Sequence, residues 1–277
     1  MKSLSIFILL MSLNIQGQNL KIMTYNLRYD NPNDGENKWD LRKRILSQQI
    51  LFYSPDIFGT QEGKLHQLQY LDSTLIEYNF IGIGRDNSQN QGEFSAIFYN
   101  KNKFKVINQS TFWLSETPDK VSKGWDANLE RICTYALFED IKTRKKFYVF
   151  NTHFDHIGEI ARTNSATLII QQINAINTKN YPVVLTGDFN SEPDSKAYHY
   201  ISTKLNDSKN ISKTPPFGPD GTFNNFEFHK PVNLLIDYIF TSKNNIEVLK
   251  YAVLSDSENC RYPSDHLPVF AELLIKK

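Results

Sequence analysis

Polar side chains that can bind metal ions or transfer protons recur where the apolar segments of this chain end. Asn26 and His153 each end such a segment, and Glu62 closely follows another. In open-sheet folds, ligand sites form at the ends of strands, where such side chains converge. The pattern therefore predicts a polar site at one rim of a sheet, built from Asn26, Glu62, His153, Asp188, Asn190, Asp265 and His266.

Asp188 and Asn190 form an acid–amide pair within the segment Gly-Asp-Phe-Asn. In an extended chain, the side chains of residues i and i+2 point to the same side, so both groups would face one site. Gly187 allows the backbone to bend or to approach a neighbour closely. A carboxylate can hold a water molecule and an amide can donate to a phosphoryl oxygen, which suits ester hydrolysis. The alternative is an Asx turn that ends a strand.

Two acid–histidine pairs are expected from the cost of burying a carboxylate. Asp237 lies within an apolar segment, where its charge needs a compensating partner. We expect it to orient His266, which follows Asp265 in a proline-bounded turn that would hold the imidazole exposed. The alternative for this turn is a capping aspartate beside a surface histidine. Glu93 also borders an apolar segment, and His153 is its expected partner.

The donor atoms of the expected site predict the metal that it would bind. Carboxylate and amide oxygens are hard ligands, which favour Mg²⁺ or Mn²⁺ over Zn²⁺. His153 and His156 lie three residues apart, but no third nitrogen or sulfur ligand accompanies them, so a zinc site is not expected. The expected metal ligands are Glu62, Asn26 and Asp265, with Asp188 nearby.

Short apolar segments alternate with helical ones, which predicts an α/β fold. Leu168, Ile169, Ile173 and Ile176 recur at helical spacing, so this face would pack on a sheet. The long irregular segments lack linker composition, and we expect one domain over residues 18–277. The expected strands are 20–25, 56–60, 80–83, 94–99, 106–112, 134–140, 146–151, 183–186, 235–241, 246–253 and 269–275, and the expected helices are 39–53, 66–76, 160–179 and 195–205.

The N-terminus has the layout of a signal peptide. Lys2 precedes an apolar run over residues 4–13 that is too short to cross a bilayer, and cleavage is expected after Gly17. We therefore expect a secreted or periplasmic protein, bacterial in origin, without a transmembrane segment. The alternative is a buried first strand or helix.

Charge and cysteine content limit the possible partners. The net charge is +1, and removal of Lys2 with the signal peptide would leave 30 basic and 30 acidic residues. A protein that binds long nucleic acids by counterion release is usually more basic, so small or locally bound substrates are favoured. An exported protein could pair Cys133 with Cys260, but we favour unpaired thiols in a monomer.

Ordered motifs along the chain resemble those of the DNase I-like endonuclease/exonuclease/phosphatase superfamily. Segments 35–39, 112–116 and 131–135 are similar to secreted bacterial members related to deadenylases. The resemblance implies a four-layer α/β sandwich, in which two packed mixed β-sheets are flanked by helices. The motifs are Tyr25-Asn26-Leu27-Arg28, Gln61-Glu62, Gly92-Glu93-Phe94, Asn151-Thr152-His153, Gly187-Asp188-Phe189-Asn190, Ile236-Asp237-Tyr238 and Ser264-Asp265-His266.

The resemblance also implies roles for the site residues. Glu62 would be the principal Mg²⁺ ligand, with Asn26 and Asp265 nearby. Asp188 would orient or activate the attacking water, and Asn190 would stabilise the charge that develops on phosphorus. His266, oriented by Asp237, would act as acid, base or electrostatic clamp, and His153 would contact the phosphate. The identity of the general base stays open at this point.

The substrate also stays open. A nuclease or 3′-exonuclease acting on nucleic acid or nucleotides, a sphingomyelinase-like phospholipid hydrolase, and a phosphoinositide or sugar-phosphate phosphatase would all use this core. A binding protein that kept the fold and lost the chemistry is the alternative from another class, and the complete catalytic set argues against it. Arg28, Arg131 and Arg162 are secondary candidates for contacts with the substrate.

Overall fold

The structure is a computed structural model that describes residues 17–276. The predicted signal peptide, apart from Gly17, lies outside the described residues. Within the described part of the chain, no helix is long and apolar enough to cross a membrane.

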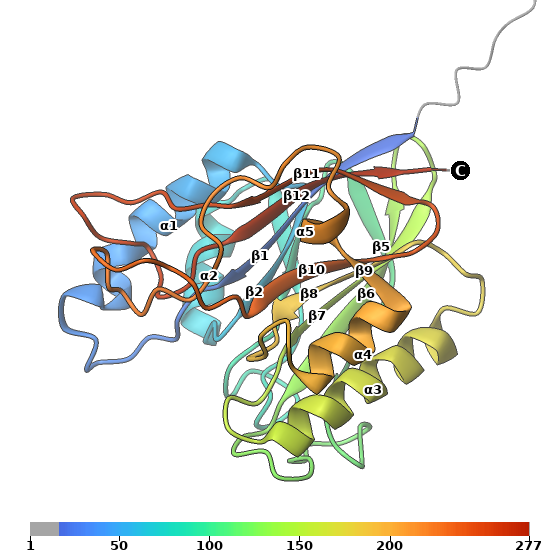
Figure 1. The fold of residues 1–277 in the computed structure, drawn as a ribbon, viewed down its shortest axis with the longest axis horizontal. Helices are drawn as coiled ribbons and strands as arrows, with labels where there is room; N and C mark the ends of the chain where they lie inside the picture. The colour runs from blue at the N-terminus through green and yellow to red at the C-terminus, as the bar shows by residue number, and fades with distance from the viewer. Residues whose placement is uncertain (1–16, 277) are drawn as a thin grey trace, which may run out of the picture.

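Two six-stranded β-sheets pack face to face, and helices cover their outer faces (Figure 1). The first sheet has the order β11-β12-β1-β2-β4-β3 and the second β5-β6-β7-β8-β10-β9. The strands of the first sheet are β1 (Gln18–Asn26), β2 (Ile57–Gln61), β3 (Tyr78–Ile81), β4 (Ile97–Asn100), β11 (Ile246–Val253) and β12 (Val269–Ile275). Those of the second are β5 (Phe104–Trp113), β6 (Ile132–Asp140), β7 (Lys146–His153), β8 (Val183–Asp188), β9 (Leu205–Asp207) and β10 (Asp237–Ser242). The four-layer sandwich is confirmed.

Each sheet is mixed, with one parallel pair near its centre. In the first sheet β1 runs parallel to β2, and in the second β7 runs parallel to β8. The outer neighbours of these pairs, β12 and β10, are antiparallel to them. The carboxyl ends of β1, β2, β7 and β8 therefore deliver the residues that follow them to the site.

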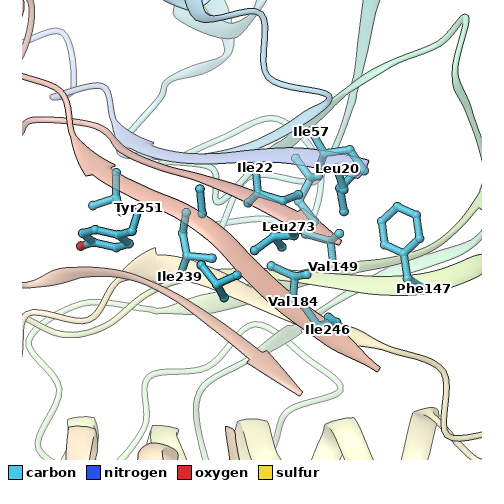
Figure 2. Close-up of a cluster of buried hydrophobic side chains, with 14 of the residues drawn as sticks. Leu20, Ile22, Ile57, Phe147, Val149, Val184, Ile239, Ile246, Tyr251 and Leu273 are labelled. Atoms are coloured by element: carbon cyan, nitrogen blue, oxygen red, sulfur yellow. The ribbon is translucent and has the colours of Figure 1, made fainter. Parts of the chain in front are cut away.

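Three apolar layers hold the sandwich together. Between the sheets, Leu20 and Ile22 of β1 and Leu273 of β12 lie in one cluster with Val149 and Val184 of the second sheet (Figure 2). Alternate residues of these strands are apolar and buried, as expected for two sheets that share a core.

The longer helices supply the outer two layers, and a single-turn helix contacts strands of both sheets. They are α1 (Trp39–Tyr53), α2 (Leu65–Thr74), α3 (Glu159–Ile176), α4 (Lys196–Lys204) and the single turn α5 (Ser208–Ile211), with a 3₁₀ turn η1 (Gly35–Asn37) before α1. Leu46 and Ile50 of α1 pack on the first sheet, and Ile169 and Ile173 of α3 pack on the second. The face of α3 follows the helical spacing in the sequence.

The expected elements are all present, with some ends displaced. The strand expected from residue 94 begins at Ile97, because Phe94 instead forms isolated bridges with Gly63 and Gly84. The two short elements β9 and α5 were not expected, since β9 exists only through its pairing with β10. Cys133 is buried, Cys260 is exposed, and both thiols are free, so the expectation of unpaired cysteines is confirmed.

Candidate active site

A cleft of about 510 Å³ opens at the rim where the two parallel strand pairs end. Glu62 follows β2, His153 ends β7 and Asp188 ends β8, while His266 precedes β12. The candidate residues that line the cleft are Arg28, Glu62, Glu93, Arg131, His153, Asp188, Asn190, Asp265 and His266. The chain thus brings together side chains that are up to 238 positions apart, the separation of Arg28 and His266.

Three potential metal ligands lie close together in this cleft. One ligand atom from each of Glu62, Asp188 and His266 lies within 4.8 Å of the others. The side-chain amide of Asn26 bridges the two acids, donating to Glu62 Oε1 at 3.1 Å and to Asp188 Oδ2 at 2.9 Å. The buried amide therefore stabilises the close approach of two carboxylates that would otherwise repel each other.

Asp265 lines the same cleft. Among the described residues, however, it does not belong to the cluster of three potential ligands. Its Oδ2 is 3.5 Å from Arg28 Nη1. Arg28 is itself fixed by Asp34, whose two carboxylate oxygens accept from Nε at 3.0 Å and Nη2 at 2.9 Å. Such a two-point ion pair fixes the plane of the guanidinium, so Arg28 is held at the cleft beside Asp265.

Asp237 orients His266, as the sequence predicts for a carboxylate in an apolar segment. Asp237 Oδ2 lies 2.9 Å from His266 Nδ1, and both side chains are buried. Asp237 begins β10 directly opposite Asp188 in the antiparallel register. Burial opposes a charge on the imidazole, but the carboxylates of Asp237 and Asp188 raise the pKa of His266 well above its ordinary value.

The expectation that His266 is exposed is wrong. Its residue exposure is 4%, and the ring of Phe223 packs on it edge-on with 5.0 Å between centroids. The proline-bounded turn therefore holds the imidazole in a buried position beneath the ring of Phe223. Its Nε2 lies 3.8 Å from Asp188 Oδ2 inside the cleft.

Asp188 is placed where its carboxyl group is hard to ionise. Burial and the nearby charge of Asp237 raise its pKa to about 7, although His266, the Asn190 amide and Asn26 act in the opposite direction. A carboxyl group that titrates near neutral pH can both accept and return a proton, which is the property a general acid–base catalyst needs.

The expected pair of Glu93 and His153 is wrong. Glu93 Oε2 instead lies 2.7 Å from Arg85 Nη1, and His153 Nε2 lies 3.4 Å from Asp188 Oδ2. A permanently charged guanidinium compensates a half-buried carboxylate better than an imidazole whose pKa is low. Burial and the adjacent Arg131 and Arg85 hold the pKa of His153 well below its ordinary value. The single sequence signal for Arg85 was its place just after the apolar segment of β3.

The extended arrangement expected for Asp188 and Asn190 is also wrong. The strand ends at Asp188, and Asn190 adopts a left-handed backbone with φ of 44°. Its backbone amide donates to Asp188 Oδ1 at 2.9 Å, so the Asx turn forms, and both residues still line the cleft. Gly187 is required by close approach, because a Cβ there would lie 2.4 Å from the carbonyl oxygen of Thr152.

Four described residues of the cleft share an uncommon backbone conformation. Arg28, Glu62, Asn190 and Asn225 have φ values of 55°, 62°, 44° and 53°, in the left-handed region that non-glycine residues adopt at a cost of roughly 1 kcal/mol or more. Such residues persist where the surrounding structure holds them in place. Neither the apolar pattern nor the motifs indicate this feature.

The segment after β7 forms one wall of the cleft around Arg131. Asp155 Oδ2 lies 3.4 Å from Arg131 Nε, and a second nitrogen of the same guanidinium, Nη2, lies 2.9 Å from His156 Nδ1. Arg162 donates to the backbone oxygen of Asp155 at 3.1 Å and lines a neighbouring cleft instead of the central one. Of the three arginines singled out from the sequence, Arg28 and Arg131 therefore lie at the central cleft.

A family model described as the Endonuclease/Exonuclease/phosphatase family matches residues 11–266. The chain belongs to this family. Its members are hydrolases that act on phosphate esters. The resemblance drawn from the motifs is confirmed, whereas export and bacterial origin remain predictions.

Solved structures from the same family are similar over most of their length. A family protein from Bacteroides thetaiotaomicron is 39% identical, covers 95% of this chain and 100% of its own, and superposes with a TM-score of 0.91. The mannosyl-6-phosphatase of Bacteroides thetaiotaomicron VPI-5482 is 41% identical, covers 92% of this chain and 99% of its own, and has a TM-score of 0.88.

A more distant similarity connects the chain to an exoribonuclease. The 3′-5′-exoribonuclease subunit Ccr4 of the CCR4-Not complex from Candida albicans is 23% identical over 298 residues. The match covers 87% of this chain but 38% of Ccr4. The chain thus spans well under half of that protein.

Proposed function

We propose that the chain is a divalent-metal-dependent phosphoesterase that hydrolyses its substrate by attack of water on phosphorus. The observation that carries the proposal is the cluster of Glu62, Asp188 and His266, whose ligand atoms lie within 4.8 Å of one another in the cleft. In this cluster Glu62 would hold the ion through a carboxylate oxygen, which suits Mg²⁺ or Mn²⁺, while Asp188 and His266 lie close enough to act on the bound water and phosphate. Asp265, beside this cluster, adds a further acid that a cation would neutralise.

The chain's own residues supply the binding and proton-transfer groups. His266, fixed by Asp237, presents Nε2 to a phosphoryl oxygen as a charged donor. Asp188 exchanges a proton with water or with the leaving alcohol, and Asn190 is held beside it. A bound divalent ion would polarise the phosphoryl oxygens and absorb the charge that develops on them.

A phosphomonoester of a sugar is the first candidate substrate. The relative with 41% identity is a mannosyl-6-phosphatase, whereas identity to the exoribonuclease is 23%. The overall charge of +1 also gives little attraction for long nucleic acid. Nuclease activity is the second candidate and rests on the similarity to Ccr4.

Hydrolysis of a panel of esters tests the proposal, measured as phosphate released from the monoesters and as shortening of the RNA. The panel contains a hexose 6-phosphate, a nucleoside monophosphate, an aryl phosphate and single-stranded RNA, each with Mg²⁺, Mn²⁺ or EDTA. We expect turnover of at least one ester with metal and none with EDTA. Metal-independent turnover, or no turnover of any ester, would contradict the proposal.

Glu62→Gln tests the metal ligand directly. The substitution keeps the shape of the side chain and removes its charge, so we expect the Mg²⁺ concentration for half-maximal activity to rise about tenfold or more. Isothermal titration calorimetry of Mg²⁺ binding to the substrate-free variant gives a readout that does not depend on turnover. An unchanged Mg²⁺ affinity would remove Glu62 from the ligand set.

Export and a monomeric state complete the proposal. Residues 1–17 carry the signal-peptide layout that the sequence predicts. N-terminal sequencing of the protein after expression with its leader in a bacterial host should begin at Gln18. Light scattering should give the mass of one chain.

A further inference from the structure

A second cleft of about 540 Å³ adjoins the catalytic one. His156, Asn190, Leu234 and Ile236 line both clefts, so the two share a wall and a boundary. A substrate with its phosphate in the catalytic cleft can therefore extend across this boundary. The remaining part of that substrate would lie between the beginnings of α3 and α4, from which Glu159, Arg162 and Lys196 line the second cleft.

The imidazole of His156 is fixed in one tautomer at the boundary between the clefts. Arg131 Nη2 lies 2.9 Å from its Nδ1, and a guanidinium can only donate hydrogen bonds. Nδ1 must therefore accept, and the ring proton must reside on Nε2. Arg131 is itself buried and paired with Asp155, so the guanidinium that fixes the His156 ring is held in place. His156 thereby offers one defined N–H donor on an exposed ring.

The charges of the second cleft disfavour a second phosphate group. Three carboxylates line the cleft, those of Glu159, Glu192 and Asp194, against the two cations Arg162 and Lys196. A polyanionic ligand would meet net repulsion there. Carboxylates beside N–H donors instead form the acceptors and donors that hydroxyl groups need.

The helix starts at this cleft are also occupied. Backbone amides that could bind a phosphate at the start of α3, those of Ile160 and Ala161, donate to Asp126 at 3.3 and 2.6 Å. At the start of α4, the amide of Tyr198 donates to the Ser195 hydroxyl. These amides are thus bonded within the chain itself and are not available to an anion.

The walls also lack the surface that a base or a lipid chain would need. Among the described residues that line the second cleft, none is Phe, Tyr or Trp, His156 is the one ring, and the apolar residues are Ala197, Leu234 and Ile236. Stacking on aromatic rings provides much of the affinity of proteins for nucleobases. A polar, uncharged and hydroxyl-rich group fits these walls better than either.

We propose that the second cleft binds the alcohol part of the phosphate ester, that this part is a sugar, and that His156 is the specificity residue that donates to one of its oxygens. The inference deepens the proposed function and rests on it, since the phosphate must occupy the cleft at Glu62 and His266. It adds a subsite for the sugar of that ester and a donor of known tautomer.

The test compares three phosphomonoesters that differ in the alcohol: mannose 6-phosphate, 5′-AMP and p-nitrophenyl phosphate. We expect the wild-type kcat/KM to be highest for the sugar phosphate. His156→Ala should lower kcat/KM for mannose 6-phosphate at least tenfold more than for p-nitrophenyl phosphate, mainly through KM. His156→Gln retains an N–H donor and should recover part of this loss, while His229→Ala, an exposed histidine outside both clefts, is the matched control.

Two measurements without turnover accompany the kinetics. The ¹⁵N shifts of the His156 ring should show a protonated Nε2 and an unprotonated Nδ1. Mannose 6-phosphate should raise the thermal midpoint of Asp188→Asn protein more than inorganic phosphate does, and Glu192→Gln combined with Asp194→Asn should reduce this difference.

The outcomes separate the inference from the function that it rests on. If wild-type protein hydrolyses none of the three esters with metal, the proposed phosphomonoesterase activity fails. If it hydrolyses them but 5′-AMP is preferred, or His156→Ala lowers kcat/KM equally for the sugar and aryl esters, the sugar subsite is wrong and the phosphatase proposal stands. An Nδ1-protonated ring would also overturn the role of His156.

Discussion

At the scale of single residues, the cleft holds buried and half-buried carboxylates with few compensating cations. Glu62, Asp188, Asp237 and Asp265 lie around one imidazole, His266. Such crowding is unfavourable in the folded state without an added positive charge. The same crowding gives a divalent ion a place where it neutralises several groups at once.

Asp188→Asn should separate stability from activity. The amide keeps the shape of the side chain and removes a charge that burial and Asp237 oppose, so we expect turnover to fall at least about 10³-fold while the thermal midpoint in EDTA rises by about 3–6 °C. Calorimetry and phosphate release on the same preparation measure both effects. A lower midpoint would show that this carboxylate stabilises the apoprotein.

Asp237→Asn should act through the imidazole that it holds. Loss of the charge at 2.9 Å from Nδ1 should lower the pKa of His266, and kcat should fall by about 10²–10⁴-fold. NMR titration of the ring in wild type and variant gives the direction of the pKa change, which a purely structural role would leave unaltered. Asp207→Asn controls for general destabilisation, because Asp207 is a buried aspartate of β9 that does not line the cleft.

The sequence predicted the Asp237–His266 pair because a charge in an apolar segment needs a partner and few residue types can serve. The same reasoning failed for Glu93, because several cationic side chains could pair with it and their distance along the sequence does not show which one lies nearest in the fold. Arg85 lies eight residues before Glu93 and pairs with it through the turn after β3. A burial argument thus identifies the need for a partner, whereas the fold decides which one.

At the scale of elements, periodicity predicted the long helices and buried strands, and it failed only where an end depends on a particular side chain or a distant contact. The helix at 39–53 was expected with the bounds that it has, and residues 246–253 and 269–275 form the expected strands. Asn190 was misplaced because its left-handed turn depends on a side chain, Asp188, and not on apolar spacing. β9 depends on contact with a distant strand, which local patterns do not contain.

The loop after β7 is held by one buried carboxylate, and its removal should destabilise the protein. Asp155 accepts from the backbone amides of Leu129, Ile157 and Gly158 and pairs with Arg131. Asp155→Ala should lower the free energy of unfolding by about 3 kcal/mol, because a buried guanidinium and three amides lose their acceptor. Urea denaturation measures this loss.

Acid should remove the same stabilisation. Burial alone would raise the pKa of Asp155, but the amides and Arg131 lower it to about 2. A carboxyl whose pKa is lower in the folded state stabilises the fold above its unfolded pKa, near 3.8, and this contribution disappears as the pH falls towards 2. The stability difference between wild type and Asp155→Ala should therefore narrow between pH 4 and 2. A constant difference across this range would contradict the assignment.

At the scale of the whole molecule, the site exists because two sheets meet with their polar ends in register. The interface is not wholly apolar near the cleft. Asn151 of β7 donates to the backbone oxygens of Thr60 and Ala96, and accepts from Gln61 and Thr186, all within the buried interior. The bonds with Thr60 and Gln61 of β2 cross from one sheet to the other and fix their separation below the cleft residues, whereas Thr186 lies on β8 of the same sheet as Asn151. Sequence motifs indicated that Asn151 matters, but they did not indicate that its partners lie on two sheets.

Asn151→Ala should loosen both the fold and the site. Four hydrogen-bonding groups would lose their partner in a region without access to water, so we expect the free energy of unfolding to fall by about 2–4 kcal/mol. Gly59 packs directly on this amide, since a Cβ there would lie 2.3 Å from Asn151 Oδ1, and the surrounding backbone has little freedom to close the gap.

The matched control is Asn108→Ala, at an exposed asparagine on the outer strand β5. In a urea denaturation of both variants, it should change the free energy of unfolding by less than about 0.5 kcal/mol. Because β7 leads from Asn151 directly to His153, the looser interface should also lower kcat/KM in the soluble, folded fraction of Asn151→Ala. Equal stability of the two alanine variants would mean that apolar packing alone sets the distance between the sheets, and that the buried amide has no part in aligning the four strand ends that carry the site.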